Sequence, residues 1–183
     1  MSRIFRGEQM LDLVLIFGQS DRGTENELGS GRLMFSQTAE YAVRAVVMLA
    51  HLKKETLVGS KELAEQARVP TSYLPKLMQS LAKAGIVNSR RGVGGGFSLR
   101  RSPQEITILD IVNAVDPIKR IVGCPLGLES HREILCPMHA RLDQAIAEVE
   151  CVLSASTIAE LLTDETRPTP MLETESFLRP GHN

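Results

Sequence analysis

The sequence predicts a mainly helical fold, a winged helix-turn-helix with a two-stranded wing, followed by a long helix. Three capped, amphipathic helical patterns occupy residues 36–85, and a glycine-centred hairpin pattern follows at residues 86–100. Three helices and then a hairpin, with a turn of three or four residues before the third helix, is the element order of a winged helix-turn-helix. Aromatic residues make up only 4% of the chain, so aliphatic side chains must build the core, as suits helix packing.

The first predicted helix covers residues 36–55. Ser36 is a favourable N-cap, and Glu40 lies in the first turn. Lys53 and Lys54 lie at the far end, so the charges at both ends complement the helix dipole. The centre of the segment is rich in Ala, Val, Met and Leu on most sides, which predicts a largely buried helix.

A short second helix is predicted at residues 60–68 and a third at residues 72–85. Thr71 or Ser72 is the expected cap of the third helix, and Gly85 is expected to end it. Apolar residues recur in the third helix at steps of three and four, namely Leu74, Leu77, Met78 and Leu81. This spacing buries one face and leaves the opposite face polar.

The pattern beyond the third helix predicts a hairpin and two further main helices. Strand-like runs at residues 86–90 and 97–100 flank the sequence RGVGGG, which predicts a flexible glycine tip. Thr107 is the expected cap of the next amphipathic helix. A long helix is expected to start near Met138, with an apolar stripe of Leu142, Ile146, Val149 and Val152. Cys151 lies beside that stripe and is expected to be a buried thiol.

Charge and composition narrow the class of function. Residues 34–101 contain eleven lysines and arginines against four acidic residues, whereas residues 102–183 contain six against thirteen. This asymmetry indicates that the basic half faces a polyanion. The chain has no glycine-rich phosphate loop after a strand and no grouped nucleophile, base and acid, so we predict that it is not an enzyme. Three cysteines, an odd number, without a recognisable export cleavage site favour a cytoplasmic protein with no membrane segment.

The third helix and the wing carry the side chains expected to contact double-stranded DNA. Hydroxyl, phenol, ammonium and amide groups at the start of the helix can bond to base edges and phosphates. Arginines beside the wing glycines can reach the backbone or a narrow minor groove. The predicted DNA-binding residues are Thr71, Ser72, Tyr73, Lys76, Gln79, Arg90 and Arg91. The alternative is a winged-helix module that binds protein, with these residues as solvated surface.

The strings SQTAEYAVRAVVMLA, VPTSYLPKLMQSLAKAGIVNSRRGVGGGFSL and ITILDIVNAVD resemble the IscR/NsrR-type (Rrf-type) family of bacterial winged helix-turn-helix transcriptional regulators, over roughly residues 34–162. The resemblance implies a homodimer formed through the long helix, and palindromic operators. It also implies that Ser72, Tyr73 and Lys76 lie at the base-contacting start of the reading helix. Pro75 stands where a member of the family has an acidic side chain that helps to select operators, which implies a different operator class.

The sequence CPLGLESHREILCPMH supplies four metal-ligating side chains, Cys124, His131, Cys136 and His139. In cluster-binding members of the family, three cysteines and a fourth, non-cysteine ligand hold a 2Fe–2S cluster here. Cys124 and Cys136 match the first and last of those cysteines, and the place of the absent middle one falls at Ser130. The resemblance implies ligation by the two cysteines with His131, His139 and Glu40, the glutamate reaching over from a partner subunit. A disulfide switch, a zinc site and a loop without a cluster are the alternatives.

These interpretations divide the chain into five parts. They are residues 1–33, an extension that is disordered or not translated; 34–118, the DNA-binding domain; 119–138, the cysteine loop; 139–163, the dimerisation helix and a short final helix; and 164–183, a disordered tail. For the first part we favour translation from Met34.

Overall fold

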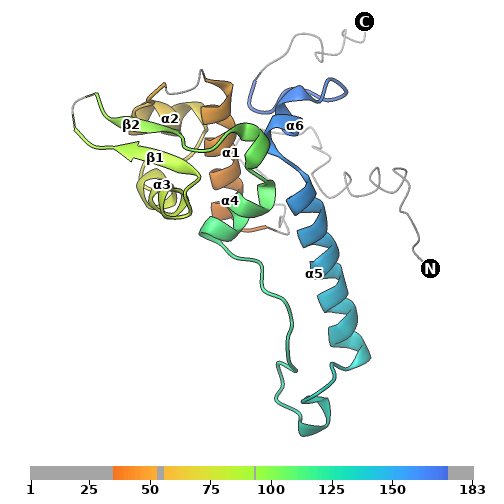
Figure 1. Ribbon diagram of the computed structural model, residues 1–183. Helices are drawn as coiled ribbons and strands as arrows, with labels where there is room; N and C mark the ends of the chain where they lie inside the picture. The colour runs from red at the N-terminus through yellow and green to blue at the C-terminus, as the bar shows by residue number, and fades with distance from the viewer. Residues whose placement is uncertain (1–34, 53–55, 93, 173–183) are drawn as a thin grey trace, which may run out of the picture. The chain divides into compact units, whose positions relative to one another are not determined.

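The computed structural model describes residues 35–52, 56–92 and 94–172, so the predicted extension at residues 1–33 lies outside the described residues. Its elements, in chain order, are α1 (Gln37–His51), α2 (Ser60–Gln66), α3 (Leu74–Lys83), β1 (Val87–Arg90), β2 (Gly96–Leu99), η2 (Pro103–Glu105), α4 (Ile108–Val115), η3 (Glu129–His131), α5 (Pro137–Ala155) and α6 (Ile158–Thr163) (Figure 1). The predicted mainly helical fold with a two-stranded antiparallel wing is confirmed. Over the described ranges, no helix combines the length and apolar character that a membrane span requires.

The hydrophobic core forms where α1, α2, α3, the wing, α4 and α6 meet. The four apolar residues predicted for the inner face of α3 are all buried: Leu74, Leu77, Met78 and Leu81. The centre of α1 is buried from Ala45 to Leu49, as its composition predicts. Aliphatic burial of this kind is the main source of stability in a helical domain, so the core fixes α3 and the wing as one unit.

The start of α3 differs from the prediction. The helix begins at Leu74, and no side chain caps it, so the prediction that Thr71 or Ser72 is its cap is wrong. The backbone N–H groups of Tyr73 and Leu74 both donate to Pro70 O, at 2.9 and 3.3 Å. Because this turn already satisfies the backbone groups that a capping hydroxyl would serve, Thr71 and Ser72 remain outside the helix with exposed side chains.

Helices α2 and α3 end in the same backbone motif. After α2, Val69 N–H donates to Ala64 O at 2.9 Å, and Arg68 takes a left-handed conformation with φ of 52°. After α3, the corresponding left-handed residue is Gly85 with φ of 72°, which confirms the prediction that this glycine ends the helix. An arginine in that conformation is uncommon, because a Cβ atom disfavours it.

The wing is a tightly packed hairpin in which two glycines are required by the space around them. Its register pairs Arg90 with Gly96. Val58 forms an isolated antiparallel bridge with Phe97 and exchanges hydrogen bonds with it at 3.0 and 2.9 Å. A Cβ atom on Gly96 would lie 2.4 Å from Val58 O, and one on Gly95 would lie 2.2 Å from Arg90 O. Both glycines are therefore required by close backbone approach, which a flexible tip alone does not explain.

Helix α6 packs against the same hydrophobic core as α1 to α4. Thr107 caps α4 as predicted, with its hydroxyl accepting from Asp110 N–H at 3.1 Å. Thr157 caps α6 in the same way and forms an isolated β-bridge with Thr107. Next to this bridge, Ile158 N–H donates to Ile106 O at 2.9 Å, and both isoleucine side chains are fully buried. The start of α6 therefore belongs to the core of the domain.

The first part of the predicted disordered tail makes contacts with α1. His51 Nε2 lies 2.9 Å from Pro170 O, and Met171 packs against the hydrophobic core. Residues 173–183 lie outside the described residues. The prediction of disorder rests on the polar composition of this segment. That composition does not reveal that Met171 packs against the core.

Candidate DNA-reading surface and cysteine loop

The predicted DNA-binding residues all have exposed side chains on the outer side of α3 and on the wing, two elements that contact each other. They are Thr71, Ser72 and Tyr73 in the turn before α3, Lys76 and Gln79 in α3, and Arg90 and Arg91 at the wing. Because the apolar residues of the same helix are buried beneath them, these polar groups can approach DNA without disturbing the core.

Tyr73 differs from the other predicted DNA-binding residues in having an aromatic contact with α1. It is 51% exposed, and its ring meets the ring of Tyr41 edge to face, with 6.0 Å between centroids and 74° between planes. The guanidinium of Arg44 lies 5.6 Å from the centre of the Tyr41 ring. Arg44 also pairs with Glu40 one turn away in α1 and donates to Arg68 O at 3.4 Å.

Neither Tyr41 nor Arg44 is among the site residues that the sequence pattern predicts. A usable signal existed, because Glu40 and Arg44 are four residues apart, the spacing at which a glutamate and a following arginine meet on one helix face. The sequence pattern instead predicts that Glu40 complements the helix dipole, and the resemblance implies that it binds a cluster. The contact between Tyr41 and Tyr73 joins residues 32 positions apart, and no local pattern predicts such a pair.

The two wing arginines lie at the end of β1 and just after it. Arg90 pairs with Gly96 across the hairpin, and Arg91 precedes Gly92, whose φ of 98° turns the chain. Both side chains are exposed, and within the part of the chain that the structure describes neither has an ion-pair partner. Their guanidinium groups are thus available to phosphate oxygens.

The cysteine loop brings its four predicted ligands into two pairs. Cys124 Sγ lies 3.6 Å from His131 Nδ1, and Cys136 Sγ lies 3.4 Å from His139 Nδ1. His131 belongs to η3, whereas Cys136 is the N-cap of α5 and His139 is buried in its first turn. Each thiol therefore faces one imidazole from the next helical turn.

Two thiols and two imidazoles match a 2Fe–2S cluster or a zinc ion in kind and number of donors. The geometry of one chain does not complete such a site, because no group of three or more His, Cys, Asp or Glu side chains gathers at metal-binding distance among the described residues. Glu40, the remaining predicted ligand, is ion-paired with Arg44 in α1. Within one chain, the structure thus brings the predicted ligands together only pairwise.

Cys151 does not have the place that the sequence predicts. Its thiol is exposed rather than buried. The side chains of α5 that are buried or half-buried include Ile146, Glu150 and Leu153, whereas Cys151 lies on the same exposed side as Gln144 and Glu148. The interpretation as a buried thiol failed because a stripe of apolar residues does not reveal how far around the helix its partners extend.

An arginine ties the beginning of the cysteine loop to α5. Arg120 donates to both carboxylate oxygens of Asp143, at 2.7 and 2.5 Å, and reaches Glu150 at 3.6 Å. The backbone N–H of Ile121 donates to Asp143 at 2.8 Å. The hydrogen bond from Arg120, followed by the one from Ile121, lowers the pKa of Asp143, and the hydrogen bond with Asp143 raises the pKa of Arg120.

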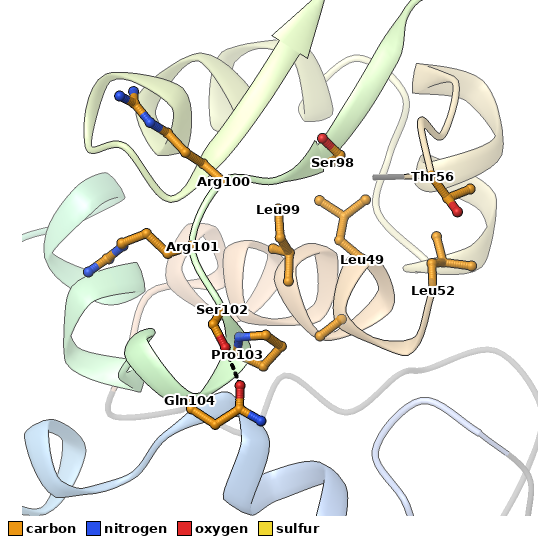
Figure 2. Close-up of a pocket in the computed structure, with 11 residues that line it drawn as sticks. Leu49, Leu52, Thr56, Ser98, Leu99, Arg100, Arg101, Ser102, Pro103 and Gln104 are labelled. Carbon is orange, nitrogen blue, oxygen red and sulfur yellow. Dashed lines mark hydrogen bonds between the residues drawn. The ribbon is translucent and has the colours of Figure 1, made fainter. Parts of the chain in front are cut away.

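A pocket of about 310 Å³ lies between the end of α1 and the base of the wing (Figure 2). Leu49, Leu52 and Leu99 form its apolar side, and the guanidinium groups of Arg100 and Arg101 point away from Leu52 (Figure 2). Arg101 is bound to Asp110 at 3.0 Å. None of the predicted DNA-binding or metal-ligating residues lines this pocket.

Comparisons with known proteins agree with this architecture. The family model described as "Rrf2: Iron-dependent Transcriptional regulator" matches residues 35–164. The HTH-type transcriptional regulator NsrR of Geobacillus kaustophilus is 29% identical over 134 residues, which cover 72% of this chain and 91% of the relative.

Two solved structures extend the agreement to the fold. IscR of T. potens is 28% identical, with a TM-score of 0.60 over 81% of this chain and 99% of that one. CymR (YrzC), the global cysteine regulator of B. subtilis, is 25% identical, with a TM-score of 0.57 over 70% of this chain and 95% of that one. The similar proteins are transcriptional regulators, which confirms the prediction that the chain is not an enzyme.

Proposed function

We propose that this chain, which belongs to the Rrf2 family of transcriptional regulators, reads palindromic operator DNA as a homodimer and senses redox state, iron or nitric oxide through a 2Fe–2S cluster in its cysteine loop. It would act in the bacterial cytoplasm. The observation that carries the DNA-reading part is the set of exposed polar side chains on α3 and the wing, above a fully apolar inner face.

In this proposal α3 enters the major groove. Ser72, Tyr73 and Lys76 face base edges at its start, and Gln79 reaches one turn further. Thr71, in the turn before α3, would bond to base edges or phosphates beside them. The two wing arginines contact the backbone or a narrow minor groove beside the same half-site.

The apolar stripe of α5 supports a second copy of the chain as the partner. Met138, Leu142 and Val152 are 58%, 52% and 38% exposed, at a spacing that places them on one side of the helix. Exposed apolar residues in a line are typical of a helix that packs against another helix. Two α3 helices held by such a dimer would read half-sites about one DNA turn apart.

The cysteine loop joins the DNA-binding domain to α5, so a change in its ligation would alter how the two wings of the dimer are placed. The proposed ligands are Cys124, Cys136, His131 and His139, with Glu40 of a partner subunit as the alternative oxygen donor. A bound 2Fe–2S cluster would supply a one-electron redox centre. The paired thiols and imidazoles support this ligand set.

DNA binding is tested by fluorescence anisotropy on an operator fragment and on random DNA across a range of salt concentrations. We expect Arg91→Ala to weaken both complexes and to reduce the salt slope by about one unit, because one phosphate contact is lost. Arg167→Ala is the matched control, since that arginine is exposed and ion-paired within the C-terminal segment. Salt-insensitive binding by the unaltered protein would instead favour a protein-binding module.

Cluster binding is tested by anaerobic purification followed by a visible spectrum and by iron and sulfide assays. We expect visible absorption with equal iron and sulfide, lost in Cys136→Ala and retained in Cys151→Ala, whose exposed thiol has no histidine beside it in the described structure. A colourless, iron-free protein from iron-replete cells would overturn the proposal that a cluster is bound, and it would leave the DNA-binding proposal intact.

A thiol or zinc switch is the second candidate for the cysteine loop. It is supported by the chemistry of the donors, because each thiol lies beside one imidazole, at 3.6 and 3.4 Å, and cysteine and histidine are also the ligands that zinc prefers. A measurement of zinc content, and a free-thiol assay before and after oxidation, distinguish a zinc site from a disulfide switch. Stoichiometric zinc would indicate a metal site, and loss of two thiols on oxidation would indicate a disulfide between Cys124 and Cys136.

A further inference from the structure

The rotamer of Tyr73 is restricted by a contact from outside its own helix. It belongs to the N-cap residue of α3, is 51% exposed and forms no capping hydrogen bond. A half-exposed side chain at a helix start samples several rotamers unless a neighbour restricts it. The edge-to-face contact with Tyr41 is the ring contact that restricts it in the described structure.

Arg44 in turn restricts Tyr41. Its guanidinium lies 5.6 Å from the centre of the Tyr41 ring, on the same helix three residues away. A planar guanidinium near an aromatic ring attracts it electrostatically and fixes the ring plane. Glu40 forms an ion pair with Nη2 of the same guanidinium, so a second residue of α1 restricts the arginine.

The same guanidinium contacts the turn that precedes α3. Arg44 Nη1 donates to the carbonyl oxygen of Arg68, at 3.4 Å, and Arg68 is the residue in the left-handed conformation between α2 and α3. One side chain of α1 therefore contacts both the turn that aims α3 and the ring that supports Tyr73.

We infer that Arg44 is a positioning residue for operator reading, which sets the ring of Tyr73 through Tyr41 and the turn at Arg68. The inference rests on the proposed role of Tyr73 at the start of the reading helix. It assigns Arg44 an effect on the discrimination between operator and random DNA, although Arg44 itself contacts no base. A direct phosphate contact by Arg44 would have a different signature, an equal loss of affinity for all DNA with a smaller salt slope.

The first test needs no DNA. The chain contains two tyrosines and no tryptophan, so tyrosine ring labelling gives NMR signals from Tyr41 and Tyr73 alone. We expect Arg44→Met to shift the ring signals of both tyrosines, whereas Arg167→Met leaves both unchanged. An unshifted Tyr73 signal in Arg44→Met, with a shifted Tyr41 signal, would overturn the inference.

The second test measures the operator-to-random affinity ratio and the salt slope for the full chain. We expect Arg44→Met to lower the ratio about fivefold with the salt slope unchanged, and Arg44→Lys, which keeps the charge and loses the planar fork, to lower it less. Tyr73→Ala is the reference variant. Because Arg44 and Tyr73 would act in series, the double variant should lower the ratio no further than Tyr73→Ala does.

The outcomes separate this inference from the proposed function. If Tyr73→Ala lowers the ratio and Arg44→Met does not, the positioning role fails and the proposed function stands. If Tyr73→Ala leaves the ratio unchanged, the proposed reading role fails, and the inference fails with it. A smaller salt slope in Arg44→Met would make this residue a phosphate contact. Thermal melting of each variant confirms that the comparison is made on folded protein.

Discussion

The reading head, which comprises α1–α4 with the β1–β2 hairpin, and the cysteine loop (residues 119–138) are held by different interactions. In the reading head, aliphatic residues from every helix reach full burial around α3. In the cysteine loop no residue is fully buried, and Val122, Leu126 and Ile134 are 96%, 71% and 79% exposed. The loop is instead attached through the polar contacts of Arg120 with Asp143.

This difference indicates which region can respond to a signal. A segment with few buried apolar contacts opens at low free-energy cost, whereas a packed core moves as one body. The reading head therefore preserves the geometry of α3 and the wing, and the cysteine loop can change its conformation without unfolding the head. The order of the two regions along the chain places the adaptable one between the head and α5.

The largest predicted effect tests the packing side of the comparison. Leu77 is 2% exposed in α3 and Leu126 is 71% exposed in the loop. Leu77→Ala should lower the free energy of unfolding by about 2–5 kcal/mol, because it leaves a cavity, whereas Leu126→Ala should change it by less than about 0.5 kcal/mol. Urea denaturation of both variants makes the measurement. Equal losses would contradict the division into a packed head and an open loop.

The reading head was predictable from sequence because periodic patterns determine it. The three- and four-residue spacing of Leu74 and its neighbours fixed the buried face of α3, and the turn residues located the wing. The cap of α3 was missed because a backbone turn at Pro70 replaces a side-chain cap. Within the reading head, the contacts around Tyr73 could not be predicted. They join residues of α1 to a residue at the start of α3, and no local spacing relates the two.

The cysteine loop was predictable only as a set of residue types. The spacing of cysteines and histidines names candidate ligands, and the resemblance to a family assigns them a role. The pairing of each thiol with a single imidazole depends on the path of a loop without periodic pattern. The same holds for Arg120, because its partner Asp143 is 23 residues away.

An intermediate effect tests whether α6 belongs to the reading head. Thr107 caps α4 and Thr157 caps α6 with equivalent hydrogen bonds, at 3.1 and 3.2 Å, and the two residues form a β-bridge. We expect Thr107→Ala and Thr157→Ala each to lower the free energy of unfolding by about 1 kcal/mol, in one cooperative transition. Loss of far-ultraviolet helical signal without a shift of the main transition in Thr157→Ala would separate α6 from the head.

The smallest predicted effect concerns the polar attachment of the loop. The hydrogen bonds from Arg120 and from Ile121 N–H lower the pKa of Asp143 below its usual value. The folded protein therefore favours the ionised form of this carboxyl more than the unfolded chain does. The resulting stabilisation is complete above the pKa that Asp143 has in the unfolded chain, and it is lost as the pH falls through the lower pKa of the folded protein. The attachment should therefore weaken only in acid.

Hydrogen exchange at the Ile121 amide measures this weakening directly, because that N–H donates to Asp143 at 2.8 Å. We expect its protection factor, corrected for the intrinsic rate, to decline as the pH is lowered, and Asp143→Asn to remove the decline together with part of the protection at neutral pH. Asp164→Asn is the matched control, since hydrogen bonds from Thr166 lower the pKa of that carboxyl too, in a segment outside the loop. A decline that persists unchanged in Asp143→Asn would mean that a titrating group other than Asp143 controls the protection of this amide, and the attachment of the loop to α5 could not be assigned to this ion pair.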